Sequence, residues 1–164
     1  MQSIVADTTP LNYLVLIQAA EILPNLYRKV LIPPAVRTEL AHTSTPDAVR
    51  AWISKPPSWL EVVSLKQPID SALSHLDAGE SEAISLASEL RTVLLLMDER
   101  DGVNIARQRG LMVIGTLAAL DLAALRGLVD LRTMFERLRE TSFRCPLRLM
   151  ASMLEQDAGR KKHQ

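Results

Sequence analysis

The sequence predicts an α/β fold built on a parallel β-sheet, and three observations lead to this prediction. Short apolar runs alternate along the chain with segments of helical periodicity, a pattern typical of parallel strands joined by helices. The run at 93–97, Val-Leu-Leu-Leu-Met, is continuously apolar, as expected for a central strand that is covered on both faces. Most of the helical segments begin with recognisable capping residues. The predicted strands are 4–6, 30–32, 61–65, 93–97 and 112–114.

The expected helices are marked where they begin. A Thr-Pro pair places a capping hydroxyl before a proline at the first helical position. An aspartate followed three residues later by a glutamate resembles a capping box. Helices are therefore expected to start at Thr9-Pro10, Pro33-Pro34, Thr45-Pro46, Asp77 with Glu80, Asp101 or a neighbour, and Thr116 capping 117–125; Gly110 and Gly127 are expected to end the last two.

The composition is that of an ordinary globular protein. Hydrophobic residues make up 48% of the chain and charged residues 23%. Lys and Arg together number 19, as do Asp and Glu, so a basic DNA-coating protein is not expected. The single cysteine, Cys145, excludes an internal disulfide and Cys-based metal sites. Because neither a secretory signal nor an apolar run of about 20 residues is visible, we expect a cytoplasmic protein without membrane association.

The length predicts one domain, covering residues 1–164. The segments that carry chemistry lie within residues 1–127. Residues 128–164 are predicted to form two amphipathic helices, at 131–138 and 147–154, which pack on the sheet or on another chain.

Acidic residues are expected to converge at one edge of this sheet. Asp7 and Asp98 each follow a predicted parallel strand, and ligands of open α/β sheets bind at the carboxyl ends of strands. Glu80 lies in the first turn of the helix before the 93–97 strand, and Glu39 lies on the helix after 30–32. Asp101 follows Asp98 by one helical turn. Four or five carboxylates can therefore meet at this edge.

Such a cluster predicts a bound divalent cation. Clustered carboxylates repel one another, and a hard cation with all-oxygen ligands, Mg²⁺ or Mn²⁺, relieves that repulsion. One or two such ions can activate water and clamp a phosphodiester. The mechanism then needs no histidine base, and His42, His75 and His163 show no recognisable catalytic spacing.

Five stretches of the chain, in order, resemble the PIN-domain family, in particular the compact prokaryotic members found among VapC-type toxins. Each stretch is weak alone, and the five together are specific. They span roughly residues 3 to 125, which leaves the C-terminal helices outside the resemblance. The stretches are VADTTPLNYL (5–14), IPPAVRTEL (32–40), LDAGESEAI (76–84), LLMDERDG (95–102) and VIGTL (113–117).

The resemblance implies a three-layer α/β/α fold with about four or five parallel strands and helices on both faces. It implies a Mg²⁺- or Mn²⁺-dependent endoribonuclease, the toxin of a toxin–antitoxin pair, with RNA as substrate, a small antitoxin as partner and a homodimer as assembly. The implied catalytic and metal-binding acids are Asp7, Glu39, Glu80 and Asp98, with Asp101 as an auxiliary ligand. Thr8 or Thr9 would orient the Asp7 carboxylate, and Thr116 would place a hydroxyl near the same edge.

Structural explanations compete with these functional ones. Asp7 alone is compatible with a simple turn, Glu39 with an exposed helix residue, and Asp101 with a favourable helix-dipole contact. Glu80 fits the third position of a capping box. For the whole chain, one alternative is a PIN-fold binding module that cleaves nothing, because many members carry Asp where this chain has Glu80. Phosphotransfer on Asp7 is disfavoured, because the Asp-x-Asp pattern of such enzymes is replaced by Asp7-Thr8-Thr9.

Overall fold

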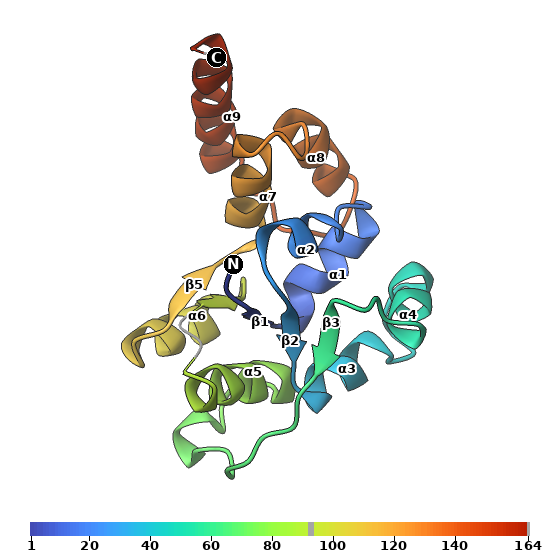
Figure 1. The fold of residues 1–164 in the computed structure, drawn as a ribbon, viewed down its shortest axis with the longest axis vertical. Helices are drawn as coiled ribbons and strands as arrows, with labels where there is room; N and C mark the ends of the chain where they lie inside the picture. Colours follow the sequence, from blue (N-terminus) through green and yellow to red (C-terminus); the bar gives the residue numbers. More distant parts are fainter. Residues whose placement is uncertain (92–93, 164) are drawn as a thin grey trace.

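A computed structural model describes residues 1–91 and 94–163 of the chain (Figure 1). Within these residues the strands form one five-stranded sheet in the order β3-β2-β1-β4-β5, and every neighbouring pair is parallel. The predicted parallel sheet is therefore confirmed. The strands are β1 (Ile4–Ala6), β2 (Val30–Ile32), β3 (Leu60–Val62), β4 (Leu94–Leu96) and β5 (Met112–Ile114).

Helices connect the strands and extend the chain beyond the sheet. A single 3-10 turn, η1 (Ser71–Leu73), precedes α5. None of the described helices is long and apolar enough to cross a membrane. The helices are α1 (Thr8–Leu16), α2 (Ile22–Leu26), α3 (Pro34–Leu40), α4 (Asp47–Ser54), α5 (Ala78–Glu89), α6 (Arg100–Gln108), α7 (Thr116–Leu125), α8 (Leu131–Arg139) and α9 (Leu147–Lys162).

Helices cover both faces of the sheet, so the molecule has the predicted three layers. Ile4 and Ala6 of β1 belong to one buried cluster, together with core residues of α1, α2, α3, α4 and α7. Val5, which points to the opposite face, packs with buried residues of α5 and α6. The alternation along β1 follows from the two-residue period of a strand. Because both faces are covered, this strand is apolar throughout.

The C-terminal helices pack against the rest of the chain. Leu131 and Phe135 of α8 and Met150 of α9 are buried in the same cluster as α1 and α7. The ring of Phe143, in the loop between α8 and α9, meets Tyr13 of α1 edge-on, with 5.1 Å between ring centroids. These contacts place residues 128–163 on the core of this chain.

The strands lie close to their predicted positions, whereas several helix starts differ from the prediction. The 61–65 strand is shorter than expected, and Val93 lies outside the described residues. The first helix begins at Thr8 with Asp7 as its N-cap, so Pro10 is its third residue. Proline is tolerated there because the first four helical N–H groups have no intrahelical partner. Pro46, rather than Thr45, is the N-cap of α4.

Two further starts differ from expectation. Glu99 is the N-cap of α6, which begins at Arg100 rather than at Asp101. Gly115 is the N-cap of α7, and Thr116 is its first residue. In contrast, Asp77 caps α5 as predicted, because its carboxylate accepts a hydrogen bond from the Glu80 amide at 2.8 Å.

Candidate active site

The topology of the sheet brings Asp7 and Asp98 to one edge. β1 and β4 are hydrogen-bonded neighbours in which Ala6 pairs with Leu96, and Asp7 and Asp98 follow these residues. The Asp7 amide donates to the Leu96 carbonyl at 2.9 Å, which extends the ladder to the last residue before α1. Helices α1 and α7 begin directly after strands β1 and β5, and α6 begins soon after β4. Their positive N-terminal ends therefore lie at the edge that carries the acids.

Asp7 is a buried carboxylate without a cationic partner among the described residues. Only 2% of the residue is exposed, and among the described residues its Oδ1 atom has no hydrogen-bond partner. Burial raises the pKa of Asp7 to about 7, and the negative charges of Asp77, Glu39 and Asp98 add to the rise, against the neighbouring Thr8 amide. A group in this state gains stability from any cation that reaches it.

Asp98 is held in place by the start of α7. Its Oδ1 accepts a hydrogen bond from the Thr116 amide at 2.8 Å, and its Oδ2 accepts one from the Thr116 hydroxyl at 2.6 Å. Burial raises the pKa of Asp98, and these two bonds oppose the rise. A Cβ at Gly115 would lie 2.6 Å from Oδ1, so only glycine leaves room for this contact. The expected Thr116 hydroxyl is therefore present at the edge, bonded to Asp98.

Glu39 reaches the site from α3 and is held by two donors. The Thr8 hydroxyl hydrogen-bonds its Oε2, and the Gly79 amide donates to its Oε1 at 3.0 Å. A side chain at position 79 would overlap the carboxylate. The resemblance implies that Thr8 or Thr9 orients Asp7. In the structure the Thr8 hydroxyl bonds Glu39 instead, because the first turn of α1 packs against α3.

Glu80 lies in the first turn of α5 and faces a polar pocket. The residue is 9% exposed. Burial raises the pKa of Glu80 to about 8, with further contributions from Asp77, through a hydrogen bond and its charge, and from the charges of Asp7 and Glu99. The Glu80 side chain is not bonded back to the Asp77 amide among the described hydrogen bonds, so only the Asp77 half of the predicted capping box is formed.

The polar pocket has a volume of about 210 Å³ and lies between α5 and α6. Asp101 lines it together with Glu80, which places the proposed auxiliary acid beside one member of the set. Thr9 is half-buried, and no hydrogen bond of its hydroxyl is seen within the described part of the chain. The residues that line the pocket are His75, Leu76, Asp77, Glu80, Glu99, Arg100 and Asp101.

Glu39, Glu80 and Asp98 are thus each brought within electrostatic reach of Asp7, but the four acids do not form a finished metal site. Within residues 1–91 and 94–163, no three acid, histidine or cysteine side chains are arranged to hold an ion. Glu39 and Asp98 are instead turned toward hydrogen-bond donors of this chain. Asp7 and Glu80 are the acids whose pKa values are raised furthest.

Sequence reasoning missed the part that two further acids play in this region. The sequence favours a helix cap for Asp77 and a surface position for Glu99, yet both raise the pKa of Glu80. For Asp77 a signal existed, because a cap in the same turn as Glu80 must lie close to it. For Glu99 no periodicity distinguishes a residue that faces a pocket from one that faces solvent.

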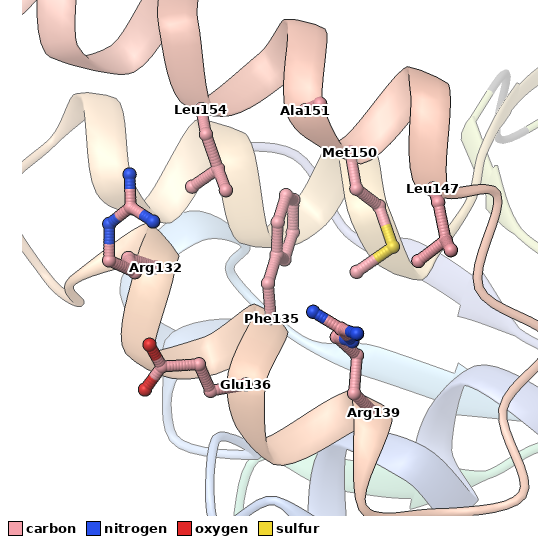
Figure 2. Close-up of a pocket in the computed structure, with 8 residues that line it drawn as sticks. All are labelled: Arg132, Phe135, Glu136, Arg139, Leu147, Met150, Ala151 and Leu154. Atoms are coloured by element: carbon pink, nitrogen blue, oxygen red, sulfur yellow. The ribbon is translucent and has the colours of Figure 1, made fainter.

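A second concave surface lies far from these acids, between α8 and α9. It is an apolar groove of about 260 Å³, and its rim carries Arg132, Glu136 and Arg139. Figure 2 shows the ring of Phe135 standing between Leu154 and Met150, with the three charged side chains along the α8 side.

Comparison with known protein families covers the segment of the chain that contains these acids. A family model described as a PIN domain matches residues 3–158. Among solved structures, the chain is similar to a PilT N-terminus domain protein from the hyperthermophilic archaeon Sulfolobus solfataricus P2, with 19% sequence identity and a TM-score of 0.49. That match covers 73% of this chain and 90% of the other. No curated protein sequence matches this chain.

Proposed function

The chain belongs to the PIN-domain family, and from this premise we propose that it is a metal-dependent endoribonuclease that hydrolyses phosphodiester bonds of RNA. PIN domains are commonly nucleases. The observation that carries the proposal is the buried carboxylate of Asp7, which has an oxygen without a hydrogen-bond partner in the described part of the chain and a pKa raised to about 7. The negative charges of Glu39 and Asp98 contribute to the raised pKa of Asp7, and the charge of Asp7 contributes to the raised pKa of Glu80, which supports a role for all four acids in one site.

The residues at this edge suit a hard divalent cation in their chemistry. Mg²⁺ in proteins commonly keeps several waters and binds one or two carboxylates directly, so it does not need a finished cage of three protein ligands. Asp7 and Glu80 would hold Mg²⁺ or Mn²⁺, because neither is neutralised by a cation among the described residues. The ion would also be contacted by Asp98, Glu39 and Asp101, either through bound water or directly after rotation of their side chains. When bound, such an ion supplies an activated water and neutralises charge on the phosphate.

The other groups at the edge position the acids. Thr116 fixes both oxygens of Asp98, and Thr8 with the Gly79 amide fixes both oxygens of Glu39. The N-terminal ends of α1, α6 and α7 contribute partial positive charge where a phosphodiester would approach. RNA would therefore meet hydrogen-bond donors at the margin of a site that otherwise carries negative charge.

The direct test is cleavage of a structured RNA in Mg²⁺ or Mn²⁺. Asp7→Asn and Asp98→Asn should each lower the cleavage rate by a factor of about 100 or more, since each removes a charge that would act on the ion. Asp47→Asn, a change at an exposed acid of α4, is the matched control and should cleave normally. Equal cleavage by all four proteins would refute the proposal.

A binding module without cleavage is the second candidate. The observation that favours it is that no three acid, histidine or cysteine side chains of the described residues are arranged as a metal site. Calorimetric titration separates the two candidates. Heat of divalent-ion binding that disappears in Asp7→Asn supports the nuclease, whereas no binding at millimolar ion, combined with tight binding to a protein, supports the module.

We also propose that the enzyme is the toxin of a toxin–antitoxin pair and acts in the cytoplasm. Growth assays test this role: expression of the wild-type chain should arrest growth, Asp7→Asn should not, and a small antitoxin protein should restore growth. Arrest by both proteins would contradict a toxic activity that depends on the acids.

The assembly that we propose is a homodimer formed through the groove between α8 and α9. Its rim carries both signs of charge, so that under twofold symmetry Arg132 or Arg139 of one copy can meet Glu136 of the other. Leu147, which lines the groove, is 59% exposed in the single chain. Light scattering should give a dimer that Leu147→Glu converts to a monomer; a wild-type monomer at micromolar concentration would refute this assembly.

A further inference from the structure

Three of the six glycines in the chain face a carboxylate of the candidate active site. At each of them, a Cβ atom added to the backbone would lie within 3.2 Å of a carboxylate oxygen, which is closer than most real Cβ atoms approach another atom. At the other three, an added Cβ would meet no atom of the described residues within 4 Å. In the described part of the chain, glycine is therefore packed closely only where it meets these acids. The three pairs are Gly79 with Glu39, Gly102 with Glu80, and Gly115 with Asp98.

The three glycines share a place in the fold. Gly79 is the second residue of α5, Gly102 is the third residue of α6, and Gly115 is the N-cap of α7. The acid that each one faces comes from another element: from α3, from α5 and from the end of β4. Each acid thus lies against the N-terminal end of a helix to which it does not belong. The partial positive charge of that end favours the carboxylate, and the missing side chain lets it come close.

Backbone donors reinforce two of the contacts. The Gly79 amide donates to Oε1 of Glu39 at 3.0 Å, and the Thr116 amide, directly after Gly115, donates to Oδ1 of Asp98 at 2.8 Å. A Cβ at Gly115 would lie 2.6 Å from that same Oδ1 atom. Because an amide bond of this length requires the carboxylate to reach the backbone, a side chain at either glycine would oppose it.

The third contact, at Gly102, has little room to adjust. An added Cβ would lie 3.2 Å from Oε2 of Glu80 and 2.7 Å from Sδ of Met97. Met97 is fully buried, and the Glu80 side chain is already hydrogen-bonded to Asp77. A methyl group at position 102 would therefore displace Glu80, Met97 or both. Glycine in a helix is less favourable than alanine, and the contact with Glu80 gives a reason for glycine at this place.

We propose that Gly79, Gly102 and Gly115 are positioning residues, which set the places of three acids and thereby the affinity of the site for a divalent cation. The inference rests on the proposed function, in which these acids surround the ion. Mg²⁺ demands near-ideal octahedral geometry, so an acid that is displaced by part of an ångström contributes less to its binding. Groups that only orient the ligands of a metal commonly change its affinity by a factor of about 10 to 100.

The first test measures binding of Mn²⁺ by calorimetry. Gly79→Ala, Gly102→Ala and Gly115→Ala should each raise Kd for Mn²⁺ about tenfold relative to the wild-type chain. Gly159→Ala is the matched control, because its added Cβ meets no atom of the described residues, and it should leave Kd unchanged. Thermal unfolding establishes that each variant is folded. Excess Mn²⁺ should restore RNA cleavage by the three variants, since their defect is one of affinity.

The second test examines the contacts without metal. In chelator, the change in the urea midpoint caused by Gly102→Ala is measured in the wild-type chain and in a Glu80→Ala chain. The change should be more favourable in the Glu80→Ala chain, because the carboxylate that the methyl group displaces is gone. Met97 is present in both chains, so its effect cancels. The same comparison pairs Gly79→Ala with Glu39→Ala, and Gly115→Ala with Asp98→Ala.

The outcomes separate this inference from the proposed function. If the wild-type chain binds Mn²⁺ and cleaves RNA, but no glycine substitution depends on its acid, the positioning role is refuted and the nuclease stands. If the wild-type chain neither binds a divalent ion nor cleaves, while the substitutions depend on their acids, the nuclease is refuted and the glycines still position the acids.

Two further results would overturn the positioning role. One is an unchanged Kd for Mn²⁺ in all three variants, and the other is an equal rise in Kd in Gly159→Ala. If Gly115→Ala does not fold, the pairs at Gly79 and Gly102 decide the question by the same criteria.

Discussion

Two regions of this molecule bury aspartate, and they treat it in opposite ways. At the carboxyl edge of the sheet, Asp7 is buried among other acids, and its pKa is raised to about 7. At the C-terminal helices, Asp157 of α9 is 5% exposed, yet Arg160 and Lys161 bind it at 3.1 and 3.0 Å. Burial pushes the pKa of Asp157 upward, and the hydrogen bonds from Lys161 and Arg160 outweigh it and lower the pKa.

The difference is whether the chain supplies the counter-charge. Around Asp157, the cations come from the same helix one turn away, and they extend the contact to Asp121 of α7 and Asp130 at the start of α8. The Thr133 hydroxyl and amide, together with Lys161, lower the pKa of Asp130 to about 2. That network fastens α9 to its neighbours. At the sheet edge the counter-charge is missing among the described residues, which is why we expect a ligand there.

The largest expected effect comes from removing the charge of Asp7. In chelator, Asp7→Asn should raise the free energy of unfolding by up to about 4 kcal/mol above pH 7, since the pKa of Asp7 rises from 3.8 to about 7 on folding. At pH values between these two pKa values, Asp7 is protonated in the folded wild-type chain and ionised in the unfolded chain. Its stability therefore falls as pH rises from about 4 to about 7, and the gain from the substitution grows over the same range. Urea denaturation at several pH values measures it.

If Asp7→Asn raises the free energy of unfolding by the same amount at pH 4 and pH 8, burial of the Asp7 charge is not the cause of the stabilisation. Asp47→Asn, at an exposed acid, should change the stability little at any pH.

The next largest effect has the opposite sign. Asp157→Asn should lower the free energy of unfolding by about 1–3 kcal/mol, because it leaves Arg160 and Lys161 without their buried partner. Urea denaturation near neutral pH provides the measurement. If Asp157→Asn instead raises the free energy of unfolding, the two buried aspartates do not differ in the way described.

Divalent cations should sharpen the distinction. At a Mg²⁺ concentration ten times its Kd, the wild-type chain should gain about 1.4 kcal/mol of stability, because the ion binds only the folded state. Asp157→Asn should show the same gain and Asp7→Asn should show none, as measured by thermal unfolding with and without the ion. A gain that persists in Asp7→Asn would place the ion elsewhere.

The smallest expected effect compares two helical glycines. A Cβ atom added at Gly159 of α9 would meet no atom of the described residues within 4 Å, so Gly159→Ala should stabilise the protein by about 0.5–1 kcal/mol. Gly79→Ala should lose this gain, because the new methyl group overlaps the Glu39 carboxylate. Denaturation of the two variants, together with cleavage by Gly79→Ala, tests the point. Equal stabilisation by both would mean that Glu39 moves aside freely.

The positions of Asp7 and Asp98 could be predicted because they depend on strand order alone. An apolar run that ends in an acid places that acid at the tip of its strand, and parallel strands share the edge. The hydrogen-bond partners of the acids at this edge could not be predicted. Thr8 hydrogen-bonds Glu39, which is 31 residues away, and the Thr116 hydroxyl bonds Asp98 across 18 residues. Such bonds depend on how helices turn about their axes, which local sequence does not specify.

The arginines in the last third of the chain illustrate the same limit. Their density along the sequence favours a solvated face, with a phosphate-contacting or partner-contacting face as the alternative. In the structure Arg137 donates to the Ile17 carbonyl at 3.0 Å, and Arg160 joins α9 to α7. Charge density along the chain does not reveal which of several similar side chains finds an anion or a carbonyl, because that choice is made by packing.

The sequence by itself determined the layered α/β fold and the edge at which the acids gather, since both follow from apolar periodicity and the order of strands along the chain. Only the tertiary structure decided which acids receive hydrogen bonds from the chain. It turned Asp98 toward Thr116 and Glu39 toward Thr8 and Gly79, and it left an oxygen of Asp7 without a partner among the described residues. The physical reason is that compensation of a buried charge depends on distances of a few ångströms between residues far apart in sequence.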